Sequence, residues 1–81
     1  MSALAESLRI HNEAQAICRP LQILVTKVDA MPESAGGGFA VTIWLPRHLA
    51  LDGPEVREVR VQLEAINGVT RIWILLAPSA D

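Results

Sequence analysis

Apolar and polar residues alternate along two short segments, and each segment carries a tryptophan on the side opposite its apolar set. Side chains of a strand point alternately to its two faces, so alternation predicts which residues share a face. In segment 39–45 the apolar set is Phe39, Val41, Ile43 and Leu45, and the opposite set is Ala40, Thr42 and Trp44. In segment 70–76 the apolar set is Ile72, Ile74 and Leu76, and the opposite set is Arg71, Trp73 and Leu75. Each segment is therefore expected to have a core face and a second face with one indole.

The N-terminal segment 1–20 favours a helix, because residues 2 to 18 contain no proline or glycine. Ser2 is the expected N-cap, and Pro20 is expected to end the helix by pushing Arg19 out of the helical region. Its apolar residues form a Leu4–Leu8 pair beside a thin stripe made of Ile10, Ala14, Ile17 and Cys18. Segment 21–45 then predicts a β-hairpin with strands 21–28 and 39–45 and a glycine-rich tip at 36–38.

Segment 54–67 fits two structures. As a helix it has Asp52 as N-cap and Glu55 completing a capping box, with Gly68 as its stop. Its apolar face would then be Val56, Val59, Leu63 and Ile66. As a strand it alternates Val59, Val61 and Leu63 with polar residues, and 67–68 would be a two-residue Asn-Gly hairpin turn. Cap signals at both ends favour the helix.

The two structures of this segment lead to two α+β architectures within a single domain, 1–81. The helix gives the order α-β-β-α-β, a small antiparallel or mixed sheet with both helices packed on one face. The strand gives an N-terminal helix followed by a four-stranded antiparallel meander of two hairpins. In both, 69–77 is the last strand and 78–81 is a tail.

The stretch from Leu63 to Ile74, Leu-Glu-Ala-Ile-Asn-Gly-Val-Thr-Arg-Ile-Trp-Ile, resembles the helix-to-strand passage of ferredoxin-like, ACT-type and iron–sulfur-assembly domains. The resemblance covers about a seventh of the chain. The reactive cysteine that the assembly family would place after the second strand has no counterpart, since 46–48 reads Pro-Arg-His.

Composition narrows the classes of function. Hydrophobic residues make up 51% of the chain and charged residues only 20%, which favours an apolar surface that a partner or second copy covers. A net charge of −2 argues against nucleic acid. One cysteine excludes an internal disulfide, and neither a signal peptide nor a membrane span is visible. We expect a soluble, cytoplasmic protein that does not bind membranes.

Few residues suggest site chemistry. His11 and Cys18 lie two helical turns apart, and with His48 they could form a metal or cofactor site. Their spacing is not that of a metal motif, and Cys18 fits better as a small core residue. His48 and Asp52 could form a base and its orienter, but a loop residue and a helix cap are favoured. No nucleophile arrangement is visible, so we predict no enzyme activity, no metal and no cofactor.

The indoles carry the main functional expectation. If the first helix covers their face, both belong to the core. If both helices pack on the other face, an interface remains, made of Thr42, Trp44, Arg71, Trp73 and Leu75. The favoured function is a protein-interaction module that self-associates or serves as an adaptor, regulator or inhibitor subunit of a larger complex. The alternatives are a small metal- or cofactor-handling domain and an ACT-like domain that senses a small ligand.

Overall fold

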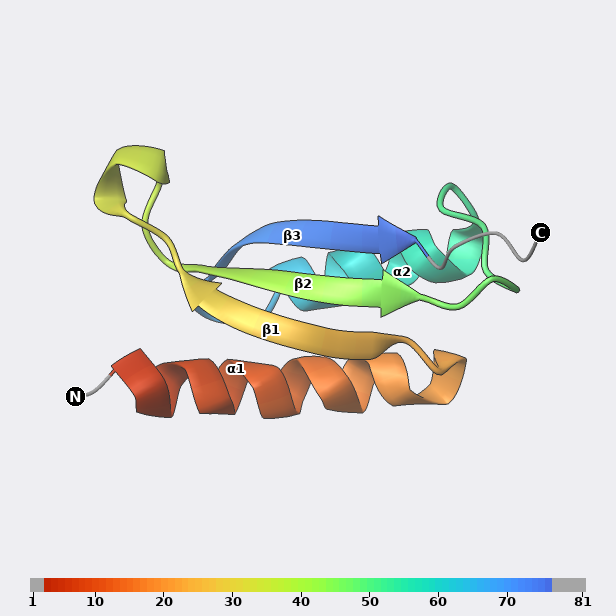
Figure 1. The fold of residues 1–81 in the computed structure, drawn as a ribbon, viewed down its shortest axis with the longest axis horizontal. Coiled ribbons are helices and arrows are strands. Elements are labelled where there is room, and N and C mark those ends of the chain that lie inside the picture. The colour runs from red at the N-terminus through yellow and green to blue at the C-terminus, as the bar shows by residue number, and fades with distance from the viewer. Residues whose placement is uncertain (1–2, 77–81) are drawn as a thin grey trace.

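Two α-helices and a three-stranded sheet make up residues 3–76, the part of the chain that the computed structural model describes (Figure 1). In chain order the elements are α1 (Ala3–Cys18), η1 (Arg19–Leu21), β1 (Leu24–Ala30), η2 (Glu33–Ala35), β2 (Phe39–Leu45), α2 (Pro54–Glu64) and β3 (Val69–Leu76). Both η elements are single 3-10 turns.

The sheet is mixed, with strand order β1-β2-β3. β1 and β2 form an antiparallel hairpin, whereas β3 runs parallel to β2. A parallel neighbour requires a crossover connection, and α2 supplies it between β2 and β3. The central strand is the most buried of the three, because both of its edges are paired.

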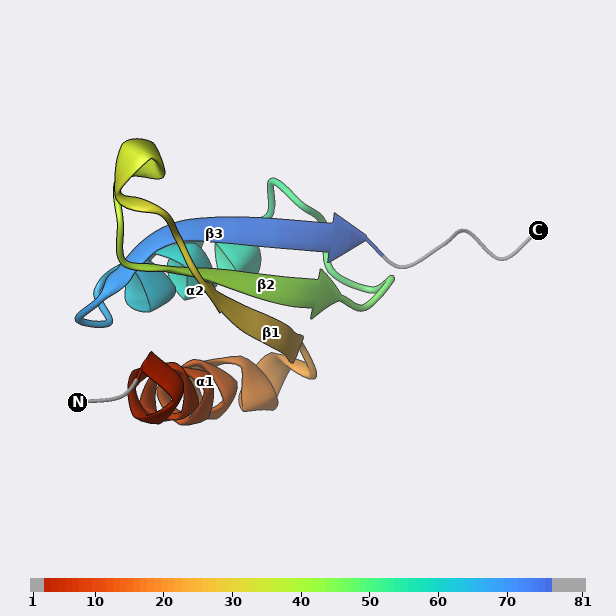
Figure 2. The ribbon, with the colours of Figure 1, turned by 60° about the vertical axis from the view of Figure 1, so that its left-hand side comes forward.

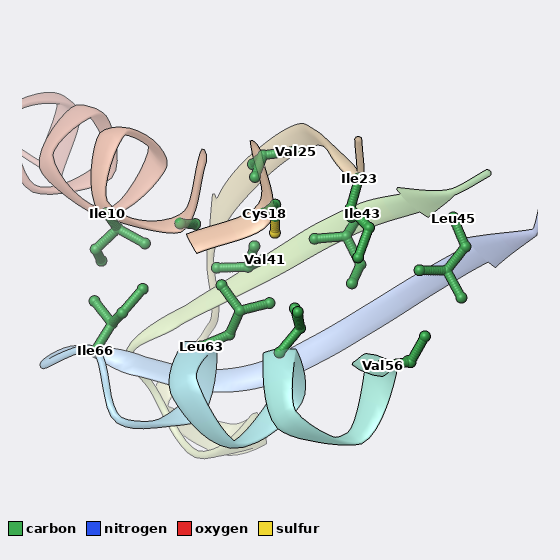
Figure 3. Packing of buried hydrophobic residues seen from close by; sticks show 12 residues of the cluster. Ile10, Cys18, Ile23, Val25, Val41, Ile43, Leu45, Val56, Leu63 and Ile66 are labelled. Atoms are coloured by element: carbon green, nitrogen blue, oxygen red, sulfur yellow. The ribbon is translucent and has the colours of Figure 1, made fainter. Parts of the chain in front are cut away.

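Both helices pack on the same face of the sheet, α1 against β1 and α2 against β3 (Figures 1 and 2). Figure 3 shows their buried side chains meeting those of the sheet in one cluster. From β2 this core takes Val41, Ile43 and Leu45; from α1, Ile10, Ala14 and Cys18; and from α2, Val56, Val59 and Leu63. The alternation in 39–45 therefore predicted the core face of β2 correctly.

The α+β class is confirmed, and the fourth strand of the alternative architecture is not found among residues 3–76. The expected α-β-β-α-β order is matched in part, since two 3-10 turns interrupt it. Within segment 54–67 the helix α2 forms over Pro54–Glu64, with Ala65 as its C-cap, because Val56, Val59 and Leu63 gain burial at helical spacing. The expected capping box is wrong: the N-cap is Gly53, with Pro54 at the first helical turn and no side-chain cap bond.

The ends of α1 also differ from expectation. The α-helix ends at Cys18, before Pro20 as expected, but Arg19 is not pushed out of the helical region. The chain continues as the 3-10 turn η1, which ends at Gln22 with a φ of +61°. In the expected stripe, Ile10, Ala14 and Cys18 are fully buried and Ile17 packs against the core partly buried, whereas Leu4 and Leu8 are exposed. The expected N-cap Ser2, the last strand residue Ala77 and the tail 78–81 lie outside the described residues.

β1 begins at Leu24 rather than Leu21, and a bulge interrupts its pairing with β2 between Val25 and Lys27. The bulge inserts Thr26 as an unpaired residue, so the faces of the strand exchange at that point. The hydroxyl of Thr26 donates a hydrogen bond to the Thr42 carbonyl at 3.2 Å, which holds the bulge against β2.

Candidate functional site

The face of the sheet opposite the helices is a three-by-three array of side chains, which we call the open face. Each strand contributes three residues to it: Leu24, Lys27 and Asp29 from β1; Ala40, Thr42 and Trp44 from β2; and Arg71, Trp73 and Leu75 from β3. Backbone register aligns them in rows across the sheet, Leu24–Trp44–Leu75, Lys27–Thr42–Trp73 and Asp29–Ala40–Arg71.

The open face changes from apolar to charged along β2. The row at the C-terminal end of β2 is wholly apolar, with Leu24 54% and Leu75 49% exposed on either side of a partly buried Trp44. The row at the other end places Asp29 and Arg71 on either side of Ala40. Because both helices lie on the opposite face, the described fold leaves this apolar row in solvent.

The middle row forms a shallow, open hollow of about 390 Å³. Its lining residues are Lys27, Asp29, Thr42, Trp73, Ile74 and Leu75. Thr42 is 3% exposed, and its hydroxyl oxygen forms no hydrogen bond with any described residue. A buried hydroxyl without a partner lowers stability, so this position is unusual in a small domain.

Charged groups stand around the hollow. The Lys27 ammonium is 3.4 Å from the Asp29 carboxylate, and both side chains are more than half exposed. The Arg71 guanidinium lies over the indole of Trp73, 5.3 Å from the ring centroid, at a distance that permits a cation–π contact. The Arg71 side chain therefore covers one face of the Trp73 indole, although Trp73 remains 48% exposed.

The five interface residues predicted from the sequence all lie on this face, but they are unequally accessible. Trp73, Leu75 and Arg71 are exposed, Trp44 is partly buried, and Thr42 is buried between the flanking strands. No face was assigned to segment 21–28 from the sequence, so Leu24, Lys27 and Asp29 were missed. For Lys27 and Asp29 strict alternation would also have failed, because it ignores the bulge. The available signal was the spacing of Val25 and Val28, which lie three residues apart rather than two.

The three residues of the alternative metal site do not come together. Among residues 3–76, no three His, Cys, Asp or Glu residues are grouped closely enough to hold a metal ion. Cys18 is fully buried in the core, where burial raises the pKa of its thiol to about 11, and His48 is exposed in the β2–α2 loop. At neutral pH Cys18 is therefore a packed thiol.

A second hollow, of about 550 Å³, lies between the two helices. Apolar residues Ile17, Pro20 and Leu21 line one side of it, and Glu55, Glu58 and Gln62 line the other. None of the residues predicted from the sequence as interface, metal-site or catalytic residues lines it. The apolar patterns of the two helices do not specify how α1 and α2 lie beside each other. The hollow between them could therefore not be predicted from the sequence.

The fold and the open face define a small α+β domain with a mixed sheet covered on one side. No helix among residues 3–76 is both long enough and apolar enough to cross a membrane. Comparison of the chain with protein-family models, with curated proteins and with solved structures gives no match.

Proposed function

We propose that this chain is a protein-interaction module that binds another protein through its open face. The observation that carries the proposal is the placement of both helices on one side, which leaves Trp73, Leu75 and Leu24 about half exposed on the other. A single exposed apolar residue is ordinary, whereas three large ones on one side of a small sheet are typical of a contact surface.

The composition of the face supports binding to a protein surface. Tryptophan and arginine are the residue types most enriched among those that dominate binding energy at interfaces, and here Arg71 stacks on Trp73. The apolar row would supply the dry centre of a contact, and the charged row with Lys27 would supply a polar rim. A partner with an apolar strip beside a mixed-charge strip is complementary to this arrangement.

The two tryptophans provide the test, since they are the only ones in the chain and both lie on the open face. The partner is sought by affinity capture from the native host with mass spectrometry, then purified and titrated into the full chain. Docking is expected to shift the indole fluorescence emission to shorter wavelength and to reduce its quenching by acrylamide. Trp44→Phe and Trp73→Phe assign the change to each indole.

Matched alanine variants decide whether the partner binds through the open face. Trp73→Ala and Leu75→Ala are expected to weaken binding roughly tenfold or more while circular dichroism shows an intact fold. Leu8→Ala removes a side chain that is 54% exposed on α1, and it should leave binding unchanged. Equal losses in the α1 and β3 variants, or no loss in any, would refute the proposal.

A second candidate function, binding of a small ligand in the middle-row hollow, is favoured by the unpartnered hydroxyl of Thr42. A free amino acid offers a carboxylate for Lys27, an ammonium for Asp29 and a side chain for the Trp73 ring. This function would match the ligand-sensing alternative drawn from the sequence. Thermal unfolding with each amino acid in turn tests it: a stabilising ligand whose effect is lost in Thr42→Val supports it, and no stabilisation by any of them excludes this ligand class.

A further inference from the structure

The two edges of the sheet are built differently, and only one of them is closed. At the N-terminal end of β1 the outer edge is occupied by Gln15 of α1, whose side-chain oxygen accepts a hydrogen bond from the Val25 backbone N–H at 3.1 Å. The Gln15 amide also donates to the Ile23 carbonyl at 3.3 Å. The side chain thus satisfies backbone groups that a neighbouring strand would otherwise bind.

Further features of β1 discourage pairing with another strand. The bulge at Thr26 breaks the regular spacing of its backbone groups, and Lys27 and Asp29 place charges along the strand. Bulges and charged side chains are common means by which proteins keep an edge strand from joining a second sheet. β1 is therefore a protected edge.

The outer edge of β3 has none of these devices apart from one charge. β3 is eight residues long and pairs only with β2, and Arg71 is its single charged residue. Among residues 3–76 no strand lies along its outer edge, and no described side chain forms a hydrogen bond with its backbone. Every second residue of β3 therefore directs its N–H and C=O groups outward without a partner strand.

We propose that the outer edge of β3 pairs antiparallel with the β3 edge of a second copy, so that two three-stranded sheets join into one of six strands. An antiparallel pairing of identical strands is self-complementary, as a two-fold dimer requires. Pairing centred on Ile72 or Trp73 keeps the two Arg71 residues from facing each other. It places the Trp73 and Leu75 side chains of both copies on one continuous face.

This inference goes beyond docking at the open face and does not require it. A monomer could bind a partner through the open face, and a dimer paired at β3 could lack any other partner. Dimerisation would also remove an aggregation hazard, since an uncovered strand that ends Ile-Trp-Ile-Leu-Leu can recruit other chains.

Sedimentation of the full chain over a range of concentrations tests the pairing. Two lysine variants distinguish a dimer paired at the β3 edge from one that associates through the open face. Trp73→Lys sets a lysine against another lysine or against Arg71 of the second copy, depending on which residue is the centre. Its dissociation constant is expected to rise about tenfold or more. Leu24→Lys makes the same kind of change at a residue 54% exposed on the open face but in β1, and it should leave the dimer intact.

Hydrogen exchange of the unmodified chain gives an independent measurement if Trp73→Lys fails to fold. Alternate amides of β3 should gain protection as concentration rises, while those of β1 should not. A wild-type monomer up to millimolar concentration, equal loss of the dimer in both lysine variants, or protection that is not in β3 would each overturn the inference. A monomer that still binds a partner through Trp73 would leave the proposed function standing.

Discussion

Gln15 completes the hydrogen bonding of β1 from outside the sheet, by accepting a bond from the Val25 backbone N–H at 3.1 Å. Val25 is 7% exposed, so without Gln15 its N–H would have little access to water. We expect Gln15→Ala to lower the free energy of unfolding by about 1–3 kcal/mol, the cost of an unsatisfied buried donor. Urea denaturation measures the change.

Gln62→Ala is the matched control, because the Gln62 side chain donates a hydrogen bond to the Glu58 side chain on the exposed side of α2 and, in the described part of the chain, to no backbone group. Its effect should be within about 0.5 kcal/mol of zero. Equal effects of the two alanine variants would contradict the role given to Gln15, and with it the argument that the β1 edge is closed.

Two neighbouring glycines separate backbone strain from crowding. Gly37 and Gly38 have φ of +68° and +70°, in the region that side chains disfavour. A Cβ at Gly37 would meet nothing within 4 Å, whereas one at Gly38 would collide with the Thr70 methyl group and lie 2.8 Å from the Gly68 carbonyl oxygen. Gly37→Ala is expected to cost about 1–2 kcal/mol for backbone strain.

Gly38→Ala should cost the same strain and about 1–3 kcal/mol more for the collision, because β3 would have to move away from the hairpin tip. Thermal or urea unfolding of both variants measures the difference. Similar losses for the two would show that the Gly38–Thr70 contact relaxes without cost.

The sequence predicted secondary structure and core faces best where apolar residues recur at the spacing of a single strand or helix. The alternation in 39–45 predicted the core face of β2, and the spacing of Val56, Val59 and Leu63 predicted α2. In α2 the competing strand pattern lost because burial of one helical face against the core outweighs a local Asn-Gly turn signal. The same signal still appears as a turn, with Gly68 at φ +102°.

Features that depend on how distant segments pack against each other could not be predicted from the sequence. The parallel pairing of β2 and β3 follows from where α2 packs, and no local pattern encodes it. The bulge at Thr26 moved Lys27 and Asp29 onto the open face, which alternation alone could not predict. Trp44 and Trp73 were correctly placed on one face, but their unequal exposure depends on the neighbours that the sheet gives them.

The buried hydroxyl of Thr42 predicts a gain in stability on its removal. Its oxygen has no hydrogen-bond partner within residues 3–76, so Thr42→Val replaces an uncompensated polar group with a methyl group of similar size. We expect Thr42→Val to raise the free energy of unfolding by about 1 kcal/mol. Thr26→Val is the control, since the Thr26 hydroxyl does bond to the Thr42 carbonyl, and it should be neutral or destabilising. A loss of stability in Thr42→Val would show that the hydroxyl has a partner in solution.

Cys18 predicts how stability depends on pH in the alkaline range. Burial without a partner charge raises the pKa of its thiol from about 9 to about 11, so the folded chain holds the proton more tightly than the unfolded chain. This contribution to stability is fully present below about pH 9. It is lost as the pH rises to about 11, because the unfolded state loses its proton first. The loss attributable to Cys18 is about 2–3 kcal/mol.

Few other groups interfere with this measurement, because the chain has no tyrosine and Lys27 is its single lysine. Urea unfolding at intervals between about pH 8 and pH 11 is expected to show the decline in the unmodified chain. Cys18→Ala, although less stable at every pH, should show a flatter profile over the same range. The thiol should also resist alkylation near pH 8 until urea unfolds the chain. Parallel pH profiles for the two chains, or rapid alkylation without urea, would mean that α1 separates from the core often enough to expose Cys18.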